Sequence, residues 1–357
     1  MAPVSNRIPH PDMEDTGSGL DYGTRPEALL GDLTPNHQFF IRSHAPTPQI
    51  DLATWELCVE GEGVRHPVSY TYQDICSSFP VVSITRTIEC AGNRRVLFGR
   101  EIGEDFEGTQ WGRGAISTAE WTGVRLRELL EPAGLTAAAF EVMPEALDAI
   151  RARRPLPLAK ALAEDTVVAF AMNGEVLPAD HGFPARLVVS GWLGAASIKW
   201  LGRIEVSDHA LHVPWNTEDY VLITGDPATD VASRSVITEP ALSALVELPW
   251  PAHLPRGPHV IRGRAFAGEA RITKVETRID DGPWATADII SPGGPGVWAR
   301  WQIRWNAEPG EHVLRVRATD DRGRTQPEST PPNVLGYMHQ SVLAHPISVD
   351  DGTGPAR

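Results

Sequence analysis

The chain has 357 residues, of which 41% are hydrophobic and 22% are charged, and its formal net charge is −14. This composition is typical of a soluble protein with two domains. The acidic balance argues against binding to nucleic acid or to an anionic membrane surface, because both need clustered basic residues. No stretch approaches the roughly 18 apolar residues of a membrane helix, so no membrane span is expected.

The first 35 residues are polar and rich in proline and aspartate, and we expect them to form a loosely ordered arm. They contain neither the apolar core of a leader peptide nor a twin-arginine pair. The chain as written is therefore expected to be cytoplasmic, whereas a removed leader would place it in the periplasm.

The hydrophobic pattern of residues 36–235 predicts a domain of the α+β class, with many short strands and few helices. Thr122 is expected to cap a helix that ends at Gly134. Asn173-Gly174 is a strong signal for a hairpin turn. Short helices are predicted at Tyr70–Ser77 and Pro155–Ala163. Strands are predicted at Trp55–Glu60, Val81–Glu89, Thr166–Met172, Arg186–Ser190 and Ser197–Val206.

A proline-rich stretch at residues 233–260 predicts a linker to a second domain. Beyond it, short alternating runs recur at regular spacing between turns, which is typical of an all-β sandwich of the immunoglobulin type. We therefore expect an arm at 1–35, a mixed domain at 36–235 and a sandwich at 236–350. The predicted strands of the sandwich are His259–Ala267, Ile272–Ile279, Arg300–Trp305 and Glu311–Ala318.

The most informative stretch runs from Val81 to Arg95, VVSITRTIECAGNRR. A predicted strand ends in Cys90, which is followed by a small-residue turn and by Arg94 and Arg95. We expect this cysteine to be biased toward the thiolate, which is the form that binds metals. Two forked guanidiniums suit an oxyanion. The functional interpretation is a metal centre with an anionic substrate, and the structural alternative is a buried cysteine before a polar turn.

Other candidate groups are ambiguous when each is taken alone. His181 and Arg186 flank a Gly-Phe-Pro turn and suit a phosphate, but a surface loop with a structural histidine fits equally. For Lys199, at a predicted strand edge, an ordinary exposed lysine is the favoured interpretation. For Tyr220, in the loop that begins at Trp215, a packing role is the favoured interpretation. The three cysteines form neither a CxxC pair nor a disulfide framework. Walker, GxGxxG, GxSxG and HExxH motifs are absent from the sequence, and no feature favours a hydrolase that uses Cys90 with His181.

Taken together, several stretches resemble the sulfite oxidase family of molybdenum enzymes over roughly residues 37–345. These are FFIRSH, TIECAGNRR, WGRGAISTAEWTGVRL, MNGEVLPADHGFPARLVVSGWLGAASIKWLGRIEVSD and the later DYVL, which occur in the family's order. The resemblance implies a mixed α+β molybdopterin-binding domain followed by an immunoglobulin-like dimerisation domain. It therefore also implies a homodimer.

The resemblance further implies that Cys90 ligates molybdenum through its thiolate. The other metal ligands would be the dithiolene of a molybdopterin cofactor and oxo groups. No cytochrome domain is recognised in the sequence, so no haem is expected and the electron acceptor would be external, either cytochrome c or oxygen. The family also uses an acidic residue near 145–148, which the sequence does not assign. The residues implied to hold the cofactor are Phe40, Ile41, Arg42, Ser43, His44, His181, Arg186, Ser197, Ile198 and Lys199.

For the substrate, the resemblance implies a cationic pocket made by Arg42 and Arg95, lined by Trp111, with Tyr220 near the metal. A third arginine could come from Arg300 or Arg304, or from neither. Pro332-Asn333 stands where the family has Trp-Asn, which leaves a closing contact open.

The implied reaction is oxidation of sulfite to sulfate by oxygen-atom transfer. The alternatives are nitrate or sulfoxide reduction on the same scaffold, or a cofactor-free thiol-sensing or binding protein.

Overall fold

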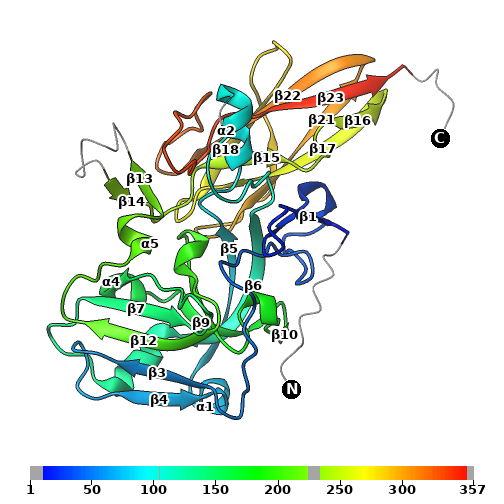
Figure 1. Ribbon diagram of the computed structural model, residues 1–357. Coiled ribbons are helices and arrows are strands. Elements are labelled where there is room, and N and C mark those ends of the chain that lie inside the picture. Colours follow the sequence, from blue (N-terminus) through cyan, green and yellow to red (C-terminus); the bar gives the residue numbers. More distant parts are fainter. Residues whose placement is uncertain (1–10, 104, 224–233, 352–357) are drawn as a thin grey trace.

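The computed structural model describes residues 11–103, 105–223 and 234–351. Figure 1 shows two stacked parts, with the blue-to-green strands mostly below and the yellow-to-red strands above. The lower part contains two five-stranded sheets, and the upper part contains a four-stranded and a five-stranded sheet. The fold is therefore mainly β, with short helices at the ends of strands.

The first sheet of the lower part carries the strand that leads to Cys90. Strand β5 pairs with β6 along its whole length, ending with Glu89 opposite Ile116. Cys90 follows directly, and its backbone N–H donates to the Ala115 carbonyl. The sheet has the order β10-β9-β6-β5, with β11 beside β9. Its strands are β5 (Val81–Glu89), β6 (Ile116–Arg125), β9 (Thr166–Met172), β10 (Glu175–Val176) and β11 (Arg186–Val189).

Strand β6 bends where it crosses β9. The register shifts between Thr122 and Gly123, and a Cβ on Gly123 would lie 2.1 Å from the Val168 carbonyl oxygen. A glycine is needed for so close an approach. Thr122 therefore lies inside a strand, and the expected helix cap at this residue is wrong, because β5 and β9 pair with this stretch on both sides. Helix α3 begins only at Leu126.

The second sheet of the lower part shares a core with the first. Its central strand β12 runs parallel to β3 and antiparallel to β7. Leu57, Val124 and Ile204, which come from both sheets, are fully buried in one apolar cluster. The strands of this sheet are β3 (Glu56–Glu60), β4 (Val68–Thr71), β7 (Glu141–Ala146), β8 (Leu156–Pro157) and β12 (Leu201–Ser207).

Short helices close several strand ends. The predicted helix near Tyr70 is confirmed as α1, and Thr71 and Asp74 form its capping box. The predicted strand at 197–206 starts only at Leu201, because Trp200 adopts the left-handed conformation with φ 53°. No helix in the described part of the chain is long and apolar enough to cross a membrane. The helices are α1 (Tyr72–Ser77), α2 (Arg95–Ile102), α3 (Leu126–Leu130), α4 (Leu158–Ala161) and α5 (Pro214–Thr217), with 3-10 turns at Pro26–Ala28, Glu131–Ala133, Ala179–His181 and Gly194–Ala196.

Residues 11–35 are docked on the lower part and, through Gly31 and Asp32, on the upper part. The expectation of a loosely ordered arm is therefore wrong for them, and residues 1–10 lie outside the described residues. Strand β1 (Met13–Asp15) pairs with β2 (Tyr22–Thr24). The Thr24 hydroxyl donates to the Gln38 carbonyl at 2.7 Å. A Cβ on Gly114 would lie 1.9 Å from the Thr24 carbonyl oxygen, so the contact depends on the missing side chain.

The upper part is a sandwich with its own core. The sheet orders are β15-β17-β21-β20 and β16-β23-β22-β18-β19. Val275, Trp301 and Leu314, from both sheets, pack in one buried cluster. The predicted strands are confirmed, with ends within two residues of the structure's. The strands are β15 (Ser243–Val246), β16 (Ala252–Pro255), β17 (Gly257–Phe266), β18 (Ile272–Ile279), β19 (Ala285–Thr286), β20 (Asp288–Ser291), β21 (Ala299–Ala307), β22 (Gly310–Asp320) and β23 (Ala344–Asp350).

The proline-rich stretch is not a plain linker. Residue 233 lies outside the described residues, and β15, β16 and the start of β17 occupy much of 234–260. Pro249 and Pro251 lie between β15 and β16, where no ladder hydrogen bond is lost. A small hairpin of β13 (Val221–Ile223) and β14 (Arg234–Val236) precedes this region.

A buried polar network joins the two parts. Arg94, which follows the Cys90 turn, donates to the Ser243 hydroxyl and to the His339 carbonyl. Its guanidinium also lies 3.6 Å from the Glu89 carboxylate. The segment from Asn333 to Met338, between β22 and β23, reaches back to the same turn. The lower part therefore receives structural support from the upper one next to Cys90.

Candidate functional site

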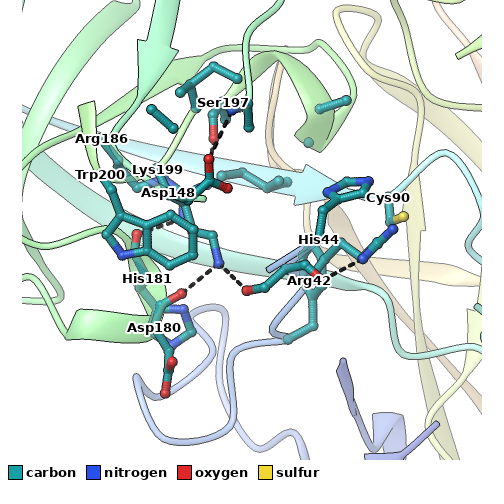
Figure 2. A pocket seen from close by; sticks show the side chains of 18 of the residues that line it. Arg42, His44, Cys90, Asp148, Asp180, His181, Arg186, Ser197, Lys199 and Trp200 are labelled. Atoms are coloured by element: carbon teal, nitrogen blue, oxygen red, sulfur yellow. Dashed lines mark hydrogen bonds between the residues drawn. The ribbon is translucent and has the colours of Figure 1, made fainter. Parts of the chain in front are cut away.

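A pocket opens beside Cys90 in the lower part (Figure 2). It encloses about 710 Å³ of empty space, with the open solvent at its mouth included. Its walls come from residues 39–44, the end of β5, the turn after β7, the loops on both sides of β11 and residues 215–220. The predicted site residues that line it are Phe40, Arg42, Ser43, His44, Cys90, His181, Arg186, Ser197, Ile198, Lys199 and Tyr220.

Cys90 is held by the turn that follows it. The Asn93 N–H donates to the Cys90 carbonyl at 3.0 Å. Burial raises the pKa of the Cys90 thiol, although Arg42, the Gly92 N–H and Arg95 act in the opposite direction. The expected bias toward the thiolate is therefore wrong for the cysteine by itself, because loss of hydration outweighs the positive charge. A cation bound to the sulfur would be needed to stabilise the thiolate.

Arg42 lines the same end of the pocket, and Figure 2 shows its guanidinium near the Cys90 sulfur. Its Nη1 donates to the Asp21 carboxylate at 3.2 Å and to the Ser43 carbonyl at 2.6 Å. Burial opposes the positive charge, but Tyr220, Asp21 and Cys90 outweigh burial and raise the pKa of Arg42. This end of the pocket therefore keeps a permanent cation.

The end of the pocket away from Cys90 carries two further cations. Lys199 Nζ donates to the Ser43 hydroxyl at 2.8 Å and to the Asp180 carbonyl at 2.9 Å. Arg186 donates to the His181 carbonyl at 3.0 Å, and its buried Nε has no hydrogen-bond partner among the described residues. Burial lowers the pKa of Arg186 to about 9, so it is charged at neutral pH. A buried guanidinium N–H without a partner, beside a lysine, suits a phosphate.

Two histidines of the pocket are neutral in the folded chain. Burial, Arg42 and Lys199 lower the pKa of His44 to about 3. Burial lowers the pKa of His181 to about 4. Since His181 Nε2 lies 2.9 Å from the Asn36 carbonyl, Nε2 carries the hydrogen and Nδ1 is left as an acceptor.

Tyr220 forms the wall of the pocket next to Arg42. Its backbone is left-handed, with φ 45°, which is uncommon for a bulky residue and typical of functional sites. Its hydroxyl lies 3.2 Å from His44 Nε2. Its ring stacks on Tyr337 with centroids 5.7 Å apart, and Trp215 contacts it edge-on. Burial raises the pKa of Tyr220, so the phenol is a neutral hydrogen-bond donor.

Ile41 and Trp111, which were predicted as site residues, are not part of the pocket lining. Ile41 is paired with Tyr22 through its backbone. Trp111 is 1% exposed and packs edge-on against Phe40. Ile41 therefore pairs with β2, and Trp111 packs in the core of the first sheet.

Arg95 also supports the pocket from outside. Its guanidinium donates to the Leu335 and Thr109 carbonyls and lies 5.0 Å from the Tyr337 ring centroid. The predicted pair of substrate arginines is therefore divided, and only Arg42 of the two lines the pocket.

The third arginine does not come from the upper part. Arg300 pairs with Asp32 at 3.0 Å, and Arg304 lines a separate surface hollow on the sandwich. Arg154, from the lower part, lies over the Tyr220 ring at 5.5 Å from its centroid. The sequence offered no signal for Arg154, because it depends on a contact across 66 positions of the chain.

In the acidic region that the sequence left unassigned, Asp148 lines the pocket. Its Oδ1 accepts from the Ala152 N–H at 2.9 Å. Glu145 points elsewhere and pairs with Arg151 and Arg153. Trp215 was also missed, although the aromatic loop that ends at Tyr220 was the available signal.

Comparison with known proteins gives the relationship of the chain. Residues 44–215 match the oxidoreductase molybdopterin binding domain, and residues 226–349 match the Mo-co oxidoreductase dimerisation domain. Sulfite oxidase from Gallus gallus is 36% identical over 339 residues, which cover 88% of this chain and 73% of that protein. The chain belongs to the sulfite oxidase family. It is a molybdopterin-dependent oxidoreductase of the sulfite oxidase or dehydrogenase type.

Other members of the family differ in length and reaction. Mitochondrial sulfite oxidase from Homo sapiens is 34% identical, over 88% of this chain and 61% of that protein. Nitrate reductase [NAD(P)H] from Hordeum vulgare is 30% identical, over 89% of this chain and 39% of that protein. The structure of the sulfane dehydrogenase SoxCD from Paracoccus pantotrophus has a TM-score of 0.81 and 28% identity, over 97% of this chain and 89% of that one.

The pocket fits the molybdenum cofactor of the family. No group of three or more His, Cys, Asp or Glu in the described residues could hold a metal by itself. A metal at Cys90 therefore needs further donors from a cofactor, as a dithiolene supplies them. Lys199 and the unpartnered Nε of Arg186 would suit the phosphate of such a cofactor.

Proposed function

We propose that this protein oxidises sulfite to sulfate with a molybdenum cofactor and passes the electrons to an external acceptor. The observation that carries the proposal is the placement of the Cys90 thiol, the Arg42 guanidinium and the Tyr220 phenol at one end of a single pocket. A guanidinium offers forked donors to a small oxyanion. Sequence similarity to the sulfite oxidases from Gallus gallus and Homo sapiens supports the same reaction.

In this proposal Cys90 is the metal ligand, because a thiolate is a soft donor that suits such a centre. Arg186 and Lys199 bind the phosphate of the cofactor, and His181 accepts a hydrogen bond through Nδ1. When bound, the cofactor supplies the two-electron redox chemistry and the transfer of oxygen. The further residues proposed to contact it are Phe40, Ser43, His44, Asp148, Ser197 and Ile198.

The substrate end depends on few groups. Arg42 binds and orients the anion, and the neutral phenol of Tyr220 donates a hydrogen bond to it. His44 fixes the Tyr220 hydroxyl at 3.2 Å without adding charge, since its pKa is about 3. Trp215 and Tyr337 hold the Tyr220 ring and keep water from its faces.

Nitrate reduction on the same scaffold is the second candidate, because the nitrate reductase from Hordeum vulgare is also 30% identical. Nitrate is another small oxyanion that one guanidinium can bind. Competition between sulfite and nitrate separates the two reactions. Metal analysis separates both, and sulfoxide reduction, from a cofactor-free thiol or binding protein.

We also propose a homodimer through the upper part, on the basis of its match to a dimerisation domain. Its two packed sheets support the immunoglobulin-like class. The domain limits of 36–235 and 236–350, a haem-free centre, cytochrome c or oxygen as acceptor, and a cytoplasmic or leader-dependent periplasmic location stay predictions.

The test is sulfite-dependent reduction of ferricyanide by protein shown to contain molybdenum. We expect Cys90→Ser to keep its melting temperature and to lose turnover by about a hundredfold or more, because the metal loses its protein ligand. Cys76→Ser is the matched control, since Cys76 lies in α1 outside the pocket. Full activity in Cys90→Ser would contradict the assignment. Loaded protein that reduces nitrate but ignores sulfite would favour the second candidate.

A further inference from the structure

Asp21 is a buried carboxylate directly behind the substrate end of the pocket. It lies just before β2 and is 2% exposed. Its Oδ1 accepts from Arg42 Nη1 at 3.2 Å and from the Ser43 N–H at 3.0 Å. Its Oδ2 accepts from the Thr109 hydroxyl at 2.8 Å. Each carboxylate oxygen is therefore held in place, beside the guanidinium that faces Cys90.

Arg42 still has donors for a ligand. Its Nη1 is used by Asp21 and by the Ser43 carbonyl, whereas Nε and Nη2 donate to no atom of the described residues. The side chain lines the pocket together with Cys90. An anion bound there would meet forked N–H groups whose positive charge is opposed by the carboxylate behind them.

The other cations near this end, Arg95 and Arg154, are not part of the pocket lining, and Arg154 lies 5.5 Å from the centroid of the Tyr220 ring. His44 is neutral, with a pKa of about 3. Arg95 lies behind the wall, with its guanidinium on the Leu335 and Thr109 carbonyls. The ion pair of Arg42 and Asp21 is partly buried, where a unit charge acts more strongly than in water. Asp21 therefore opposes, at close range, the charge of the guanidinium that an anion at this end would contact.

We propose that Asp21 is a positioning residue that holds the Arg42 guanidinium and weakens its binding of anions, so that the doubly charged product can leave. The inference rests on the proposed oxidation of sulfite, whose substrate and product are both small anions. An attraction that is equal for both lowers KM without raising kcat, and it slows release of the product. The carboxylate reduces this uniform attraction and keeps the orientation of the donors.

The variant Asp21→Asn removes the charge and keeps the hydrogen bonds. Its amide oxygen can accept from Arg42 and Ser43, and its NH2 group can donate to the Thr109 oxygen. Sulfate binding to the holoenzyme is measured by isothermal titration calorimetry, and kcat and KM for sulfite are measured in parallel. We expect sulfate to bind about tenfold more tightly, a change of about 1.4 kcal/mol. The KM for sulfite should fall by a similar factor without a rise in kcat.

Two controls separate charge from structure. Thr109→Val removes one hydrogen bond to the same carboxylate without changing any charge, and sulfate affinity should not increase. Asp32→Asn makes the same change in net charge at the surface, where Asp32 pairs with Arg300, and should leave sulfate affinity unchanged. Asp21→Ser, also neutral, replaces Asp21→Asn if that variant does not fold.

Unchanged or weaker sulfate binding in the folded Asp21 variant overturns the inference, as does equal tightening in either control. Absence of measurable sulfate binding in both the wild type and the variant overturns it as well. The comparison of sulfate affinities needs no turnover. A wild type that binds sulfate but does not oxidise sulfite would therefore contradict the proposed function alone.

Discussion

His345 shows at the scale of one residue how burial controls titration in this chain. It is 1% exposed, its Nε2 lies 2.8 Å from the Pro249 carbonyl, and its ring packs edge-on against Trp250. Burial and the charge of Arg113 lower its pKa to about 4. Removal from water acts in the same direction on His44 in the pocket, since it penalises the charged imidazole.

We predict that His345 makes the protein less stable as the pH falls below about 6.5. The unfolded chain takes up a proton near its ordinary pKa, whereas the folded chain keeps His345 neutral down to about pH 4, so the unfolded state binds more protons in this window. This group should cost about 2 kcal/mol of unfolding free energy between pH 7 and pH 5. In His345→Gln, urea unfolding should depend less steeply on pH.

The glutamine can still donate to the Pro249 carbonyl, so this hydrogen bond is kept in the variant. The variant and the wild type then differ mainly in the titration of residue 345. The exposed His66→Gln is the control. Identical pH slopes for His345→Gln and the wild type would show that His345 does not carry the effect.

At the scale of an element, the hairpin of β1 and β2 depends on one close backbone contact. Thr24 donates its N–H to the Gly114 carbonyl at 2.9 Å, and Tyr22 pairs with Ile41. These contacts hold Asp21, at the start of the hairpin's second strand, against Arg42. The hairpin is therefore part of the site and not an appendage.

We predict that Gly114→Ala detaches this hairpin. The new Cβ would lie 1.9 Å from the Thr24 carbonyl oxygen, and backbone on both sides leaves no side chain to move away. The free energy of unfolding should fall by about 2–3 kcal/mol, and limited proteolysis should cut within residues 11–25. Gly294→Ala, with no atom within 4 Å of its Cβ position, is the control. Equal protease resistance in the two variants would refute the prediction.

At the scale of the whole molecule, the two parts are joined beside the proposed metal ligand. Arg94 is 1% exposed and bonds the Ser243 hydroxyl and the His339 carbonyl of the upper part. It is also paired with Glu89 of β5. An apolar cluster that includes Ile116 and Trp298 adds contacts across the same boundary. We therefore expect both parts of the wild type to unfold in one transition.

We predict that Arg94→Met lowers the free energy of unfolding by about 3–5 kcal/mol, because it leaves the buried Glu89 without its cation. Calorimetry should then show two separated transitions. Adding Glu89→Gln should recover part of the loss, since the neutral amide can still accept from Asn93. A single transition at an unchanged temperature in Arg94→Met would contradict this account.

The sequence alone determined the features that depend on near neighbours. Alternation in Val81–Glu89 predicted the strand that ends at Cys90, and Thr166–Met172 was located to the residue. Asn173 and Gly174 turn with φ of 51° and 77°, as the hairpin signal required. The motifs around Cys90 and His181 were enough to indicate the family, because each is a short local pattern.

The tertiary structure alone decided which of these residues face the pocket and in which charge state. Arg95 lies close to Cys90 in the predicted turn, but its guanidinium donates hydrogen bonds to the Leu335 and Thr109 carbonyls. Asp21, far from any motif, reaches Arg42 through a docked hairpin. Burial reversed the expected ionisation of Cys90. The direction in which a side chain points and the extent to which it is removed from water both depend on contacts between distant parts of the chain. Local sequence patterns do not contain these contacts.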